Sequence, residues 1–511
     1  MKSDPHAKSL ASLVSSSIHL LINNDETNLH RKNHETHPIT FDHFNPASAL
    51  THSSYFLTNQ IHSLPNTKSV TYMALNHVIT IDQETVLMNT QMKQSPKLLK
   101  KSAGKSSCCI FRVPKSLVEI KKEAYQPQIV SIGPYHYGAK HLEMIQEHKW
   151  RYLNDMITRT SKSLGVFMNI VVSMENEIRE CYSESIDRYS SNEVAKMMVL
   201  DGVFLIELFR KVGNLVDIQQ DDPIFKMVWV FPFLLRDLLR IENQIPFFVL
   251  QKLFDESKPD TRRDNTRTIQ SLILKFFSYV VDRKPEAVLT QFENIDGKHL
   301  LDFVRKSFIG TKDRNSRVDG TNEPSFKLIQ PATKLVIAGV KFKVNQQAES
   351  FLDIKFQDGL LLIPQINMDD FYSSFLLNCM AFEQCYFHCS KDITSYVVFM
   401  GCLMNTSADV DLLSQSKIIE NYFGTDKEIA KFFNDVGKDI VFDKKTNYLR
   451  GLFVELNEYC KNGWHVNWAG FKHTYFESPW AAVSAFAAFM LLSLATLQTF
   501  YTVFPYYHKR D

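Results

Sequence analysis

An uncharged stretch near the C-terminus, residues 480–504, constrains this chain more than any other feature. It reads WAAVSAFAAFMLLSLATLQTFYTVF, and roughly 20 apolar residues are enough for a helix to cross a hydrocarbon core of ~30 Å. The aromatic and basic residues expected at the two membrane interfaces are Trp480, Tyr501, Tyr506, Tyr507, Lys509 and Arg510. We therefore predict one transmembrane helix at residues 480–504 and a short tail at 505–511. The alternative is a helix buried in a protein core.

Few polar side chains interrupt this stretch. Hydroxyl groups such as those of Ser484, Ser493, Thr496 and Thr499 can bond to backbone carbonyls one turn earlier. Gln498 is the one costly polar group. The stretch is therefore compatible with lipid, and everything before it is expected to be tethered to a membrane.

The composition of the whole chain is that of a globular protein. Of its 511 residues, 44% are hydrophobic and 22% are charged, which is enough for a large core. A net charge of +2 predicts no nucleic-acid partner. The eight cysteines contain no Cys-x-x-Cys pair and no repeating spacing, so we expect a reducing compartment and no disulfide framework.

The orientation in the membrane follows from the order of segments along the chain. Serines and His19 interrupt the apolar run at residues 10–22, so a secretory signal is not expected there. A helix at residues 480–504 leaves the ribosome only as synthesis ends, which favours a tail anchor with the bulk of the chain in the cytosol. Lys509 and Arg510 beyond the helix favour the opposite orientation, which stays open as the alternative.

Two regions precede the predicted anchor. Residues 1–105 are rich in Ser, Thr, Asn and His and lack sustained periodicity, so we expect a polar, flexible extension. His30, His34 and His37 have helical spacing, but Pro38 and the polar surroundings predict a solvated segment and no metal site. An entry segment, residues 109–138, follows; its Val-Pro and Gln-Pro pairs predict extended backbone. It begins a domain at residues 109–475.

The periodicity of this domain is mostly helical. Apolar residues recur at intervals of three and four over residues 194–212, 228–254, 371–389, 393–405 and 448–460. Residues 340–344 and 352–356 alternate instead, and Asp358-Gly359 is a turn signal before residues 360–363. We predict a single large, mainly α-helical domain with a small inserted antiparallel β element, followed by the transmembrane helix.

Three residues are expected to kink or end helices locally. They are Gly202, Pro232 and Pro246, which lie inside the first two helical patterns.

The chain resembles a plant protein family, DUF247, also called UPF0481, whose biochemical function is unknown. The blocks that carry the resemblance include Arg112-Val113-Pro114, Ser131-Ile132-Gly133-Pro134-Tyr135-His136, Glu242-Asn243-Gln244-Ile245-Pro246 and Ala381-Phe382-Glu383-Gln384-Cys385. They occur in family order between residues 109 and 505. One departure is Val203, where family members often carry Cys. The resemblance implies a membrane-anchored protein, and some grass members are implicated in self-incompatibility, which implies recognition of a partner.

Three acids have the helical spacing of buried residues: Asp201, Glu242 and Glu383. A buried carboxylate needs a partner, because an unpaired one is desolvated at a cost of several kcal/mol. The candidate partners are Arg112, His136, Lys149, Arg210 and Arg236, and Asn243 and Gln244 complete the candidate polar network. One interpretation is an acid pair for hydrolysis. The favoured one is a structural network that fixes helix register.

No other cluster predicts chemistry. Cys379, Cys385, His388 and Cys389 do not share one face of a helix, so no metal site is expected there. The motifs Gly-x-Ser-x-Gly and His-Glu-x-x-His and a nucleotide-binding glycine loop do not occur in the sequence, so no cofactor is predicted. Asn405-Thr406-Ser407 is the one glycosylation sequon.

Two classes of function follow. The favoured one is a single-pass, membrane-anchored recognition or signalling protein that binds an unknown protein partner. Its specificity is expected in the polar connections at residues 255–267 and 311–324. The alternative is an enzyme of unknown substrate that uses the buried acids, which requires those acids to face one cavity.

Overall fold

The computed structural model describes residues 81, 83–94, 98–258, 267–278, 295–310, 326–438, 440–442, 447–461 and 479–507. The chain divides into two units, one of residues 20–101 and one that contains residues 102–511. In the first unit, residues 83–93 are helical. Most of the predicted extension, with His30, His34 and His37, lies outside the described residues. The second unit is mainly α-helical, as predicted.

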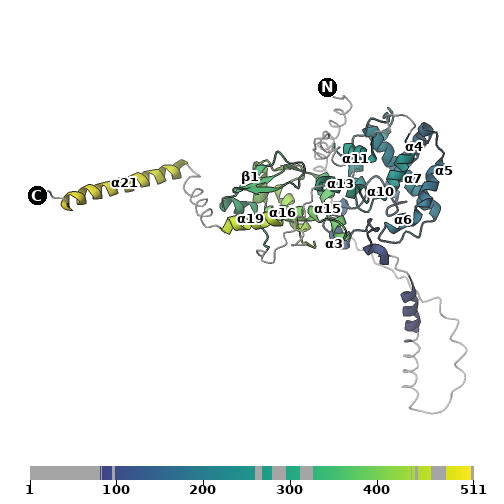
Figure 1. Cartoon of the computed structure of the whole chain (residues 1–511), viewed down its shortest axis with the longest axis horizontal. Coiled ribbons are helices and arrows are strands. Elements are labelled where there is room, and N and C mark those ends of the chain that lie inside the picture. Colours follow the sequence, from purple (N-terminus) through teal and green to yellow (C-terminus); the bar gives the residue numbers. More distant parts are fainter. Residues whose placement is uncertain are drawn as a thin grey trace, which may run out of the picture. The chain divides into compact units, whose positions relative to one another are not determined.

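Helix α7 (Ser191–Val212) is the centre of the first half of this second unit (Figure 1). Its N-terminus is fixed by a capping box, in which Ser190 accepts from the Glu193 amide and Glu193 accepts from the Ser190 amide. Every residue from Met197 to Val212 is buried, so this part of the helix is covered on all sides. The helices that pack most extensively on it are α4 (Glu143–Thr160), α5 (Leu164–Ser173), α10 (Phe247–Glu256) and α11 (Ile269–Phe277).

Gly202 does not end a helix, because α7 continues through it. A Cβ atom at Gly202 would lie 2.4 Å from Cδ1 of Leu253, so the glycine serves the close approach of α10 to α7. The predicted helix at residues 228–254 is instead divided. It forms α9 (Val230–Leu238) and α10, separated by a turn at residues 239–246 that ends in Pro246. Pro232 lies in the first turn of α9, where a backbone N–H has no helical partner to lose.

The other helices are short or belong to the second half of the unit. In the first half they are the 3₁₀ segments Lys101–Gly104, Lys122–Ala124 and Lys140–Leu142, and α3 (Lys115–Val118), α6 (Glu175–Glu180) and α8 (Pro223–Lys226). In the second half they are α13 (Leu300–Ile309), α14 (Ala332–Ile337), α15 (Asp370–Cys385), α16 (Asp392–Leu403), α17 (Ser407–Gln415), α18 (Asp426–Val436) and α19 (Arg450–Lys461). Helices α15, α16 and α19 confirm the predicted helices at residues 371–389, 393–405 and 448–460.

The predicted β element is present, but it is mixed and not wholly antiparallel. Strands β2 (Lys355–Gln357) and β3 (Leu360–Ile363) form the expected hairpin, with positive φ at Asp358 and Gly359. Strand β1 (Lys341–Val344) pairs with the other edge of β3 and runs parallel to it, because residues 345–354 return the chain before β2 begins. The sequence does not reveal a second parallel pair, β4 (Ile366–Met368) and β5 (Ile419–Asn421), since three residues are too few to show alternation.

Helix α21 (Pro479–Tyr507) covers the predicted span. Residues 483–504 are long and apolar enough to cross a membrane, and none of their most apolar window is buried in the protein. The predicted hydroxyl bonds form for Ser493, Thr496 and Thr499, which donate to Phe489, Leu492 and Ala495 carbonyls respectively. Trp480 and Tyr501 are exposed, whereas Lys509 and Arg510 lie outside the described residues.

Candidate functional site

Glu242 lies in the turn between α9 and α10 and holds the start of the entry segment. Its carboxylate accepts from Arg112 Nη1 at 2.5 Å and from the Val113 amide at 2.8 Å. His136 Nε2 is 3.4 Å from the same carboxylate, a close electrostatic contact. Burial alone would raise the pKa of Glu242, but His136, Arg112 and the Val113 amide together hold this pKa below its usual value. Glu242 is therefore a charged anchor for the entry segment.

Asp201 performs the same task from α7. Its Oδ2 accepts from the Gly133 amide at 2.7 Å, and its Oδ1 lies 2.5 Å from Nζ of Lys149 on α4. Lys149 also donates to the carbonyl of Ser131, so one buried ammonium joins α7 to the entry segment. Burial raises the pKa of Asp201, and the Lys149 charge opposes that shift.

Gly133 is required where these contacts converge. Its φ is +74°, and a Cβ atom there would lie 2.4 Å from the backbone oxygen of Gln244. That oxygen also accepts from the Tyr182 hydroxyl at 3.1 Å, so a shift of the oxygen would disturb this hydrogen bond. A larger residue at position 133 would strain the backbone and separate the entry segment from the turn.

Asn243 and Gln244 complete the predicted network with backbone groups only. Asn243 accepts from the Ile132 amide at 2.7 Å and donates to the Val130 carbonyl at 3.0 Å. Gln244 accepts from the Leu301 amide at 3.1 Å, and its amide nitrogen donates to the carbonyls of Leu238 and Arg240. Both side chains are buried, and neither presents a free polar group to a cavity.

Asp237 belongs to the network although it was not predicted from the sequence. Its carboxylate accepts from three successive amides, those of residues 128, 129 and 130, at 2.7–3.1 Å. Arg240 Nε lies 2.9 Å from the same group. Asp237 follows Leu234 and precedes Leu238 and Ile241 on an apolar face, so the spacing rule that selected Asp201 could have found it.

Glu383 lies in a different place and has different partners. It accepts from Arg305 Nε at 2.8 Å, from the Thr394 amide at 2.8 Å and from the Thr394 hydroxyl at 2.7 Å. It therefore joins α13, α15 and α16. Arg305 was not among the predicted partners, and its Nη1 also lies 3.2 Å from Oδ1 of Asp302. Two arginines that were predicted as partners pair with other acids: Arg210 pairs with Glu207, and Nη1 of Arg236 lies 3.7 Å from Oδ2 of Asp370.

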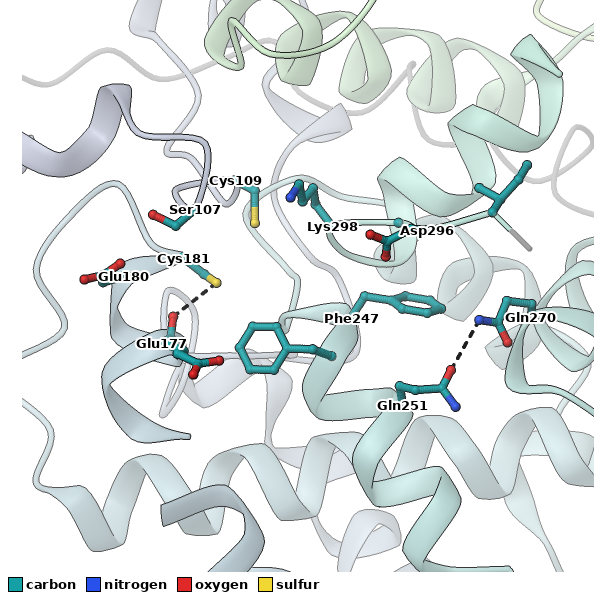
Figure 2. A pocket seen from close by; sticks show the side chains of 13 residues that line it. Ser107, Cys109, Glu177, Glu180, Cys181, Phe247, Gln251, Gln270, Asp296 and Lys298 are labelled. Atoms are coloured by element: carbon teal, nitrogen blue, oxygen red, sulfur yellow. Dashed lines mark hydrogen bonds between the residues drawn. The ribbon is translucent and has the colours of Figure 1, made fainter. Parts of the chain in front are cut away.

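The three predicted acids have separate partners. Their contacts involve three separate sets of residues, and a cationic side chain pairs with each carboxylate. A cavity of about 580 Å³ lies elsewhere, against α6 and α10 (Figure 2). Its lining contains none of the three acids. The structural interpretation of the acids therefore agrees with the contacts that the structure shows.

The cysteine cluster does not converge either. Cys379 is buried within α15, and His388 Nε2 lies 3.3 Å from the carbonyl of Gly104. Within the described ranges, no group of three or more His, Cys, Asp or Glu side chains is placed to hold a metal ion.

Buried His299 links the entry segment to α13. Its Nδ1 accepts from the Asp302 amide at 3.2 Å as the N-cap of the helix, so its Nε2 carries the proton and donates to the Cys109 carbonyl at 3.1 Å. Burial lowers the pKa of His299 to about 4, against the attraction of Asp302. The sequence pattern does not single out this residue, because a lone histidine carries no periodic signal.

An entry segment held by buried side chains of a helical domain, with an exposed apolar helix at its C-terminal end, defines the class of protein. Residues 110–494 match the model of the DUF247 family, described as plant protein of unknown function. The chain belongs to this family.

Two curated relatives come from Arabidopsis thaliana. The UPF0481 protein At3g47200 is 39% identical over 439 residues, which cover 82% of this chain and 90% of the relative. The putative UPF0481 protein At3g02645 is 23% identical over 518 residues, with coverages of 83% and 95%. No solved structure matches the chain.

Replacing Glu242 with Ala is expected to lower the free energy of unfolding by about 1–3 kcal/mol, because Arg112 and the Val113 amide lose their acceptor. Urea unfolding of the purified protein measures this change. Glu458→Ala is the matched control, since that carboxylate pairs with Lys461 on the surface and its loss should cost less than about 1 kcal/mol. Equal effects of the two substitutions would contradict the anchoring role of Glu242.

Protonation of His299 is expected to destabilise the fold in mild acid. Its pKa falls from 6.5 in the unfolded chain to about 4 in the fold, so below pH 6.5 the unfolded chain binds a proton that the fold excludes. The stability that is fully present above pH 6.5 is therefore lost as the pH falls towards 4. The full loss is on the order of 3 kcal/mol. Urea unfolding between pH 7.5 and pH 4 should show a shallower slope for His299→Asn than for the wild type.

The control for this experiment is His388→Asn, because His388 is exposed. This variant should keep the slope of the wild type. An unchanged slope in His299→Asn would show that His299 does not control acid stability.

Proposed function

We propose that this chain is a single-pass, membrane-anchored recognition protein that binds a protein partner at the membrane through its helical domain. The observation that carries the proposal is helix α21, whose apolar side chains are exposed. Phe486, Phe489 and Leu492 are each about two-thirds exposed or more. Removing such surface from water contributes about 25 cal/mol per Å², so lipid is the favoured surrounding of this helix.

The buried carboxylates support recognition more than catalysis. Glu242, Asp201 and Glu383 each accept several hydrogen bonds from the protein itself, which leaves them little capacity for a substrate. Such satisfied networks fix the relative positions of elements. A rigid scaffold of this kind suits a domain that binds a partner through its surface. An enzyme that uses these acids is therefore not proposed.

A surface turn before α9 provides a candidate contact. Within the four residues 226–229, Lys226, Met227 and Trp229 are exposed, and the centroids of the Trp229 and Phe233 rings lie 6.1 Å apart. Trp, Met and Arg are enriched where proteins bind one another. Residues 259–266 of the first segment favoured from the sequence (255–267), and all of the second (311–324), lie outside the described residues, so this placement remains a prediction.

The anchor is tested by extraction of membranes at alkaline pH. Full-length protein should stay in the membrane pellet, whereas a chain that ends at residue 478 should be soluble and keep its cooperative unfolding, because α21 faces lipid. Release of the full-length protein would contradict a transmembrane anchor. The cytosolic orientation is tested in the same vesicles: added protease should digest the domain, whereas protection, or a glycan on exposed Asn405, would reverse it.

The contact surface is tested by proximity labelling of the full-length protein. Trp229→Ser should reduce labelling of partners, because truncation of a central aromatic residue commonly costs about 2 kcal/mol or more, roughly a thirtyfold loss of affinity. Trp150→Ser is the matched control, since Trp150 is exposed to a similar extent on α4. An identical partner set for both variants and the wild type would exclude this turn, and substrate turnover by the purified domain would overturn the proposal of a binding protein.

A further inference from the structure

Two cysteines far apart in sequence are brought together at the start of the entry segment. Cys109 N and Ile110 N both donate to the Cys181 carbonyl at 2.9 Å, and the Ser183 amide donates to the Ile110 carbonyl at 2.9 Å. Ile110 therefore pairs with Tyr182 in a short parallel bridge. Cys109 and Cys181 precede the two paired residues and are in register with each other.

This register places the two side chains on the same face. Neighbouring strands lie about 4.8 Å apart, which is within the roughly 4.4–6.8 Å that separates the Cα atoms of disulfide-bonded cysteines. Both cysteines also line the cavity of about 580 Å³, and Figure 2 shows the two sulfur atoms at the same wall.

We propose that Cys109 and Cys181 are a redox modification site, at which a peroxide that enters the cavity converts the two thiols into a reversible disulfide. The bond would tie the entry segment covalently to the end of α6. Nothing in the proposed recognition function requires this reaction, so the two proposals stand separately.

The chemistry balances with one peroxide molecule. Cys181 is the more exposed of the two residues, at 5% against 1% for Cys109. Its Sγ attacks one peroxide oxygen, which forms a sulfenic acid and releases water. Cys109 Sγ then attacks the Cys181 sulfur, the S–S bond forms, and the hydroxyl leaves as a second water. Two small thiol molecules reverse the reaction by thiol–disulfide exchange and are themselves oxidised to a disulfide.

The order of attack follows from the surroundings of the thiols. The neighbouring Cys181 thiol and burial raise the pKa of Cys109, which disfavours Cys109 as the first nucleophile. Cys181 donates a weak hydrogen bond to the Glu177 carbonyl, 3.3 Å away, at the edge of the cavity. The reaction is therefore expected to be slow compared with that of a low-pKa sensor thiol.

The test uses the full-length protein in detergent, treated with hydrogen peroxide and then with a maleimide that blocks the remaining thiols. Mass spectrometry of an unreduced digest should detect a peptide pair linked through Cys109 and Cys181, and a reducing agent should release it. Cys108→Ser should retain the linked pair, whereas Cys181→Ser should lose it. Oxidation should also raise the midpoint of thermal unfolding by about 5 °C in the wild type and in Cys108→Ser only.

Each other outcome overturns the proposal. It is wrong if exhaustive oxidation of the folded protein leaves both thiols reactive or oxidised only to separate acids. A link that forms only in urea, or one that joins Cys181 to Cys108, also contradicts it. Thermal unfolding of the reduced Cys181→Ser protein confirms that this variant is folded, and Cys109→Ser provides a second variant.

Discussion

The buried backbone of the entry segment is the constraint on which this structure depends. Residues 125–138 form no helix or strand, yet residues 129–135 are buried, so their amides need acceptors from elsewhere in the chain. Asp237, Asn243 and Asp201 supply these acceptors from α9, the following turn and α7. The segment and the helices around it are therefore specified together.

This arrangement explains why a helical domain carries so many buried ions. Each acid accepts from backbone amides and also pairs with a cation, as Asp201 does with Lys149 and Glu383 with Arg305. Removing one partner of such a pair is costly, whereas the complete pair contributes mainly specificity. The acids thus position the elements that they join.

The sequence predicted burial better than it predicted pairing. Helical spacing identified Asp201, and its partner Lys149 was among the candidates, because both lie on long amphipathic helices. The same rule applies to Asp237 and Arg305, but their contacts join residues about a hundred positions apart, which periodicity does not encode. The prediction that all strands of the β element are antiparallel is wrong for a related reason, because β1 pairs with β3 and not with β2, its neighbour in sequence.

Hydrogen exchange of the amides of residues 128–130 tests the central claim most directly. In Asp237→Asn, one carboxylate oxygen is replaced by the NH2 of the side-chain carboxamide, which cannot accept a hydrogen bond. The backbone amides of residues 128–130 should therefore exchange about tenfold faster or more, while α7 stays protected. Asp411→Asn, at an exposed position, should leave all of these rates unchanged. Unchanged exchange at residues 128–130 in Asp237→Asn would contradict the claim that buried carboxylates hold the entry segment.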